Sequence, residues 1–165
     1  MNITVILIEI IIMLLVFGLF VFGMLYISPL TFISDYPPEI QEIYYRTQHK
    51  EGTKKKLTAA MKIKKLIALI AFMFLFAWMM HLAGAETFVE GLLLSYAYIL
   101  CLFAWDTFFL DWVLFANIKR IRLPGTEYME KEYHQKWFHV KVCIPMIPVF
   151  AAVGAFSALL MIWIW

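Results

Sequence analysis

Cysteine is scarce in this sequence, which has only Cys101 and Cys143. Both fall in apolar stretches at different depths, so we expect no disulfide framework. Two cysteines are also too few for a four-cysteine zinc site. Histidine is nearly as scarce, and four residues exclude membrane desaturases and hydroxylases, whose di-iron sites need a larger set. The sequence also has no glycine-rich phosphate loop and no nucleophile motif.

Lysine and arginine are absent from the long apolar stretches. Their 14 residues occupy two segments, eight between Arg46 and Lys65 and six between Lys119 and Lys141. Positive charge concentrates on the cytoplasmic segments of membrane proteins, so we expect both segments to face the cytoplasm and both termini to lie outside. The expected location is the plasma (inner) membrane. We expect the first apolar stretch to be retained, because no basic residue precedes it and no small-residue cleavage site follows it.

Apolar residues are what the sequence has in abundance, with 64% hydrophobic and 18% aromatic residues against 16% charged ones. A hydrocarbon core requires about 20 helical residues. Four stretches meet this length: residues 3–27, 66–83, 91–115 and 142–165. The sequence therefore predicts an all-α integral membrane protein, with four transmembrane helices forming one four-helix bundle domain over residues 1–165. Its first expected partner is the lipid bilayer.

The two cytoplasmic segments, at about residues 28–65 and 116–141, are expected to carry short amphipathic helices. Pro37 and Pro38 suit the first turn of one helix, and its apolar face would hold Ile40, Ile43, Tyr44 and Thr47. The basic run that follows suits contact with anionic lipid headgroups, not with nucleic acid. In the second segment, Thr126 is expected to cap a helix whose apolar face would hold Met129, Tyr133, Trp137 and Val140.

Asp106 and Asp111 stand inside a hydrophobic run, in the stretch WDTFFLDW. Counting about 20 residues from Gly91 places Asp111 near the inner interface, within reach of Lys119 or Arg122, and Asp106 deeper. An ionised aspartate at that depth costs roughly 2.5–3.5 kcal/mol on insertion scales, so Asp106 is a functional candidate. The alternative is a hydrogen bond to a neighbouring helix. Five residues of an α-helix rotate by about 140°, so the two aspartates are not expected to share a face.

A second candidate set follows in the basic segment, where Glu127, Glu130 and His134 recur at helical spacing. A carboxylate and a histidine four residues apart can hold a metal ion or exchange a proton. The alternative is an ordinary charged, solvated helix face. His134 and His139 are badly phased on one helix, and they would converge only if the chain bent between them.

These polar groups all fall near the inner leaflet, where Pro145 and Pro148 also free backbone carbonyls from helical hydrogen bonds. We infer a polar pocket between the inner halves of the third and fourth spans. Its expected ligand is a membrane-partitioning or amphipathic molecule, such as a lipid or a quinone-like compound. The sequence identifies no cofactor. The residues expected to contact the ligand are Trp105, Asp106, Asp111, Trp112, His134 and His139.

Other functions stay open at this point. One is a membrane-embedded enzyme that acts on a lipid-phase substrate, with Glu127, Glu130 and His134 as a metal set. Another is a proton- or cation-coupled transporter that works as an oligomer, with Asp106 or Glu9 as the coupling group. A third is an accessory subunit of a larger membrane complex.

Overall fold

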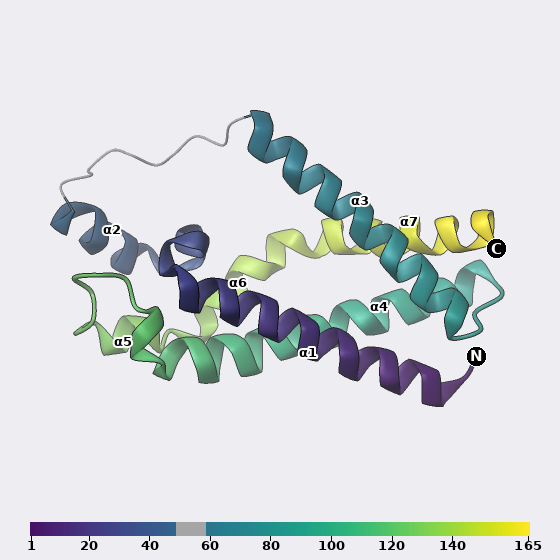
Figure 1. The fold of residues 1–165 in the computed structure, drawn as a ribbon, viewed down its shortest axis with the longest axis horizontal. Helices are drawn as coiled ribbons and strands as arrows, with labels where there is room; N and C mark the ends of the chain where they lie inside the picture. Colours follow the sequence, from purple (N-terminus) through teal and green to yellow (C-terminus); the bar gives the residue numbers. More distant parts are fainter. Residues whose placement is uncertain (49–58) are drawn as a thin grey trace. The chain divides into compact units, whose positions relative to one another are not determined.

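The computed structural model describes residues 1–48 and 59–165. It is 85% helical, and the described residues form no strand. The basic run between residues 50 and 56 lies outside the described residues. In chain order (Figure 1), the helices are α1 (Ile3–Ile27), the 3-10 helix η1 (Pro29–Asp35), α2 (Pro38–Thr47), α3 (Ala59–Leu82), α4 (Phe88–Ala104), the π-helix η2 (Trp105–Phe115), the 3-10 helix η3 (Lys119–Ile121), α5 (Glu130–Tyr133), α6 (Lys136–Cys143), the 3-10 helix η4 (Ile144–Met146) and α7 (Ile147–Ile164).

Among the described residues, four helical stretches are long and apolar enough to cross a membrane, which confirms this part of the sequence prediction. They are Ile3–Ile27, Lys62–Leu82, Phe88–Phe115 and Lys136–Ile164. The first matches the expected bounds. The other three begin three to six residues earlier than expected, because the helices continue into flanking polar residues that hydropathy alone leaves out.

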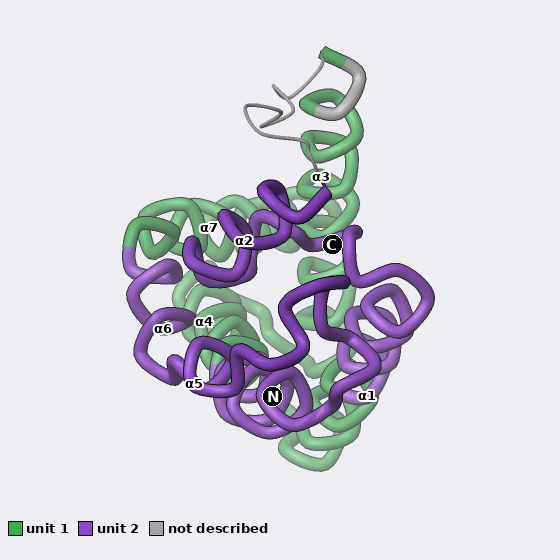
Figure 2. Tube along the Cα trace, turned by 90° about the vertical axis from the view of Figure 1, so that its left-hand side faces the viewer, with its two compact units in different colours: residues 1–14, 56–103, 145–165 green, residues 15–55, 104–144 purple. Residues whose placement is uncertain are grey.

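The chain divides into two compact units, which Figure 2 distinguishes by colour. Unit 1 comprises residues 1–14, 56–103 and 145–165, and unit 2 comprises residues 15–55 and 104–144. Three of the long helical stretches therefore contribute to both units. The unit boundary falls after Leu14 in the first stretch, after Phe103 in the third and after Ile144 in the fourth.

Unit 1 is held together by close packing of α3, α4 and α7. Phe76, Met80 and Tyr98 are fully buried in its core. Gly154 of α7 lies directly against Ser95 and Tyr96 of α4, and the Ser95 hydroxyl donates to the Gly154 carbonyl over 3.2 Å. Small residues such as Gly154 let helices approach closely in membranes.

The two chain ends of unit 1 lie beside the turn between α3 and α4. The backbone N–H of Asn2 donates to the Ala83 carbonyl over 2.7 Å. The His81 ring stacks on the Trp165 ring with a centroid distance of 4.7 Å. Gly84 has a φ of +77°, which favours glycine at this turn. Both termini and the α3–α4 turn therefore share one end of the unit.

Unit 2 contains an aromatic core formed by the two segments that were predicted to be cytoplasmic. Tyr36, Ile40 and Tyr44 from the first segment pack with residues of the second, namely Ile121, Leu123, Met129 and Tyr133. The helix α2 begins at Pro38, as the two prolines indicated. Two helices that are short and poorly stabilised alone thus bury their apolar faces against each other.

The second of these segments does not form the continuous helix that its apolar spacing suggested. The helix α5 ends at Tyr133, and α6 begins at Lys136 after the non-helical backbone of Gln135. Thr126 caps no helix, because its hydroxyl donates to the Leu123 carbonyl. Met129 and Tyr133 are buried as expected, whereas Trp137 beyond the break is 68% exposed.

Candidate functional site

The candidate site lies in unit 2, and its two aspartates are carried by the π-helix η2. A π-helix joins each N–H to the carbonyl five residues before it, and the N–H of Ala116 donates to the Asp111 carbonyl in this way. Residues five apart therefore return to nearly the same side. The expectation that Asp106 and Asp111 point to different sides assumed α-helical geometry, which this segment does not have. Nothing in the residue pattern distinguished a π-helix from an α-helix.

Asp111 is paired with His139 of α6. Its Oδ2 atom lies 3.1 Å from Nδ1 of the imidazole, and the side chains of His139 and Asp111 are 10% and 21% exposed. Sequence reasoning offered Lys119 or Arg122 as the partner of Asp111. Arg122 is engaged by Glu130 instead, while α6 packs directly on η2 and brings His139 to the aspartate.

The pairing determines what the other imidazole nitrogen can do. The His139 Nδ1–H donates to the Asp111 carboxylate, so Nε2 carries the lone pair when the ring is neutral. Nε2 is buried and has no hydrogen-bond partner among the described residues. A buried polar atom without a partner costs free energy. His139 thus presents a proton acceptor whose hydrogen-bonding capacity is unused.

A shallow pocket lies beside this pair. Its walls come from η2, α5 and α6, and it is lined by Asp111, Trp112, Ala116, Tyr133, His134, Lys136 and His139. Four of the six residues expected to contact a ligand therefore lie together. His134 and His139 converge because the chain breaks between α5 and α6, which is the bend that the sequence did not reveal.

Trp112 and Lys136 shape one wall of the pocket. The indole N–H of Trp112 donates to the Lys136 carbonyl over 2.9 Å, and the Lys136 ammonium lies 5.4 Å from the Trp112 ring centroid. The pocket thus has a fixed aromatic surface and a cation beside it. Sequence reasoning identified Trp112 but missed Lys136, which looked like one charge of an ordinary basic helix.

Asp106 lies near the pair but does not line the pocket. Its electrostatic neighbours are Asp111, His139 and Asp35, and it forms no ion pair or hydrogen bond with another residue that the structure describes. Cys143 also interacts electrostatically with Asp106 and Asp111. Asp106 is therefore a second acidic group near the Asp111–His139 pair, outside the pocket lining.

Trp105 belongs to the packing of unit 2 and not to the pocket wall. Its ring stacks on Phe109 with a centroid distance of 4.4 Å. A methyl group built on Gly18 of α1 would approach the Trp105 indole nitrogen to 3.0 Å, so the absence of a side chain at Gly18 makes room for the ring.

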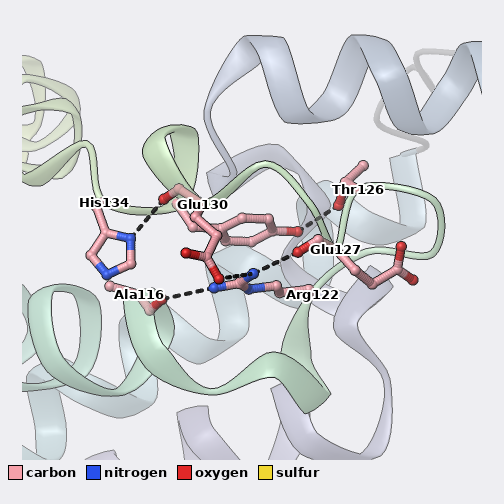
Figure 3. A network of polar contacts seen from close by, with 7 residues as sticks. Ala116, Arg122, Thr126, Glu127, Glu130 and His134 are labelled. Carbon is pink, nitrogen blue, oxygen red and sulfur yellow. Dashed lines mark hydrogen bonds and ion pairs between the residues drawn. The ribbon is translucent and has the colours of Figure 1, made fainter.

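The structure does not bring Glu127, Glu130 and His134 together as metal ligands. Figure 3 shows their separate engagements: the Glu127 carbonyl and the Glu130 carboxylate both contact Arg122, and His134 Nδ1 meets the Glu130 carbonyl at 2.6 Å. The Glu127 carboxylate accepts the N–H of Gly125. Over residues 1–48 and 59–165, no three histidine, cysteine, aspartate or glutamate side chains are grouped to hold a metal ion. The helix α5 covers only Glu130–Tyr133, so Glu127 and His134 lie outside it and the three residues have no common helix face.

Arg122 is the residue that organises this region, and sequence reasoning gave it no such role. It is 5% exposed, and its guanidinium lies 4.9 Å from the Tyr133 ring centroid while also bonding the Glu127 carbonyl over 2.6 Å. Burial raises the pKa of the Tyr133 hydroxyl above its usual value. Burial likewise raises the pKa of Tyr36, whose hydroxyl donates to the Ile121 carbonyl. Both tyrosines are therefore neutral at physiological pH.

Comparisons with known proteins add no relative from which a function could be carried over. The chain matches no family model, no curated protein and no solved structure.

Proposed function

We propose that the chain is a multi-pass membrane protein that binds the polar group of a membrane-partitioning, amphipathic ligand in the pocket beside Asp111 and His139. The observation that carries this proposal is the buried Nε2 of His139, which has no partner among the described residues while the ring is held by Asp111 through Nδ1. A ligand that satisfied this atom would recover a hydrogen bond that the folded chain leaves unmade.

The shape of the pocket supports a division of the ligand into two parts. The pocket is a shallow opening and encloses no cavity that could hold a whole ligand. Only the polar group of the ligand would contact it. The apolar remainder of a lipid or quinone-like molecule would stay in the bilayer, beside exposed aromatic residues of η2 such as Phe108 and Phe109.

The proposed membrane orientation places this pocket at the inner interface, with both termini outside and residues 1–165 acting as one transmembrane domain of the plasma membrane. Two arrangements support it. The two segments predicted to be cytoplasmic share the aromatic core of unit 2, as segments on one side of a membrane can. The chain ends and the α3–α4 turn share one end of unit 1, as three outer elements can.

Native mass spectrometry of the gently purified protein tests the proposal. We expect the wild type to carry a discrete adduct with the mass of a lipid or another small amphiphile. His139→Ala should lose most of it, whereas His81→Ala, which alters a histidine of unit 1, should keep it. A folded His139→Ala protein with the same adduct occupancy as the wild type would contradict the proposal, and so would a wild type without adduct.

A second candidate function is enzymatic, and the Asp111–His139 pair favours it. A carboxylate that orients a histidine is the usual arrangement of a general base. The enzyme would then remove a proton from a lipid-phase substrate. Incubation with a total membrane lipid extract should convert one lipid class in a His139-dependent manner, and an unchanged lipid profile over many protein equivalents would argue against this function.

A further inference from the structure

The geometry of the Asp111–His139 pair points to the chemical class of the ligand. We infer that the pocket binds a lipid-phase molecule with an acidic O–H group, of the phenol or quinol kind, and that His139 Nε2 accepts the proton of that group. This inference rests on the proposed function, because it concerns the same pocket and specifies what binds there.

The first step of the argument is that the pocket offers an acceptor. The carboxylate of Asp111 receives the Nδ1–H of His139, so the remaining lone pair of the neutral ring is on Nε2. Nε2 is buried, and no described residue donates to it. A ligand carbonyl or ether could not satisfy it, because both groups are acceptors themselves. The complementary ligand carries a donor.

The second step is that the charges around His139 favour transfer of the proton over simple sharing. Proton transfer breaks the ligand O–H bond, leaves its electron pair on oxygen and forms an N–H bond at Nε2. The resulting imidazolium would be stabilised by Asp111 at 3.1 Å, and the carboxyl group of Asp106 is a further acidic group that interacts electrostatically with His139. Cys143, also near these carboxylates, is the remaining titratable group of α6 close to them.

The third step concerns the anion that the ligand becomes. Lys136 lines the same pocket, and its ammonium is held near the Trp112 ring. It supplies a positive charge for a phenolate oxygen. The pocket lining has two other titratable residues, His134 and Tyr133, and both already have partners. His134 Nδ1 contacts the Glu130 carbonyl. The Tyr133 hydroxyl forms a hydrogen bond with the Thr126 hydroxyl. The ring of Trp112 offers an aromatic surface that suits an aromatic ligand.

The test uses an alkylated 4-nitrophenol as the probe, because this molecule partitions into detergent and changes its absorption spectrum when it loses its proton. Binding to the full-length protein is measured by equilibrium dialysis, and ionisation of the bound probe is measured by absorbance. We expect the ionisation midpoint of the bound probe to lie about one pH unit below its midpoint in protein-free micelles, a tenfold change in the ionisation equilibrium.

Variants separate the two claims. His139→Gln should still bind the probe but should lose the downward shift, and Asp111→Asn should reduce the shift because the imidazolium loses its carboxylate. His81→Gln in unit 1 should match the wild type. If His139→Gln fails to fold, the proton transfer is still tested by comparing the ionisation midpoint of the probe bound to Asp111→Asn with that of the probe bound to the wild type.

Two results would overturn the inference, and they differ. Saturable binding of a probe that stays protonated to the same pH as in micelles would refute the proton transfer while leaving a ligand pocket in place. No saturable binding by the wild-type protein would refute the pocket for this ligand class and the inference with it.

Discussion

At the scale of single residues, Tyr133 shows how one hydroxyl group holds together the part of unit 2 that carries the pocket. Its oxygen accepts the N–H of Leu123 over 2.9 Å and bonds the Thr126 hydroxyl over 2.7 Å. Its ring lines the pocket beside His134 and faces the guanidinium of Arg122. The position of the pocket wall therefore depends on a residue whose hydroxyl is engaged by Leu123 and Thr126.

Tyr133→Phe should destabilise the folded protein by about 1–3 kcal/mol, because it leaves the buried N–H of Leu123 without its acceptor. Denaturant unfolding of the purified protein in detergent measures the change. Tyr128→Phe is the matched control, since Tyr128 is 72% exposed and its replacement should leave the free energy of unfolding unchanged. Equal stability of Tyr133→Phe and the wild type would show that this hydrogen bond contributes little.

The buried tyrosines also predict a response to alkaline pH. Burial raises the pKa of Tyr36 above that of an exposed tyrosine, which is about 10. The unfolded chain therefore releases this proton before the folded chain does, and stability should be constant below about pH 10 and should fall as the pH rises further. Tyr36→Phe should flatten this fall, although it also removes the bond to the Ile121 carbonyl. An identical alkaline profile for wild type and variant would exclude this origin.

Residue-level reasoning from the sequence named some of the residues that the structure brings together. Asp111, Trp112 and His139 were named because counting along the predicted spans places them all near the inner interface. The partner of Asp111 was not predictable, because it depends on how α6 packs on η2. Arg122 and Lys136 were missed because buried and exposed basic residues look alike in a sequence rich in charge at that point.

At the scale of elements, the four long apolar helices could be predicted because hydropathy and length suffice for them. The break between α5 and α6 and the π-helical turns of η2 could not, since both preserve an apolar spacing that also fits an α-helix. These two unpredicted features affect the candidate site more than they affect the fold. Both departures from regular helix bring polar residues to the pocket.

The contact between α4 and α7 provides a test at this scale. A methyl group on Gly154 would approach the Tyr96 ring to 2.5 Å and the Ser95 hydroxyl to 2.9 Å. Gly154→Val should therefore destabilise the protein by about 1–3 kcal/mol through overpacking, seen as a lower melting temperature in detergent. Gly23→Val is the control in α1, where a built methyl group has no atom within 4 Å. A melting temperature equal to that of the control would refute tight packing at Gly154.

At the scale of the whole molecule, the proposed orientation predicts which residues are accessible from each side of the membrane. In a background with both cysteines replaced by alanine, Asn2→Cys and Glu86→Cys should react with a membrane-impermeant maleimide in intact cells. Lys131→Cys should react only after permeabilisation, because it lies in a predicted cytoplasmic segment. Labelling of Lys131→Cys in intact cells would reverse the orientation and would place the pocket at the outer face.

The π-helix η2 makes the length of the chain, and not only its composition, a determinant of the site. Along a helix, removing one residue turns everything beyond the deletion by roughly a quarter of a turn or more relative to what precedes it. A single deletion between Asp106 and Asp111 would thus change the angle between the two side chains around the helix axis while keeping both carboxylates. Either the Asp111–His139 contact would be lost, or α6 would have to move with Asp111. Insertions and deletions in this segment therefore change the relative orientation of the two carboxylates, an effect that no substitution of either aspartate would reproduce.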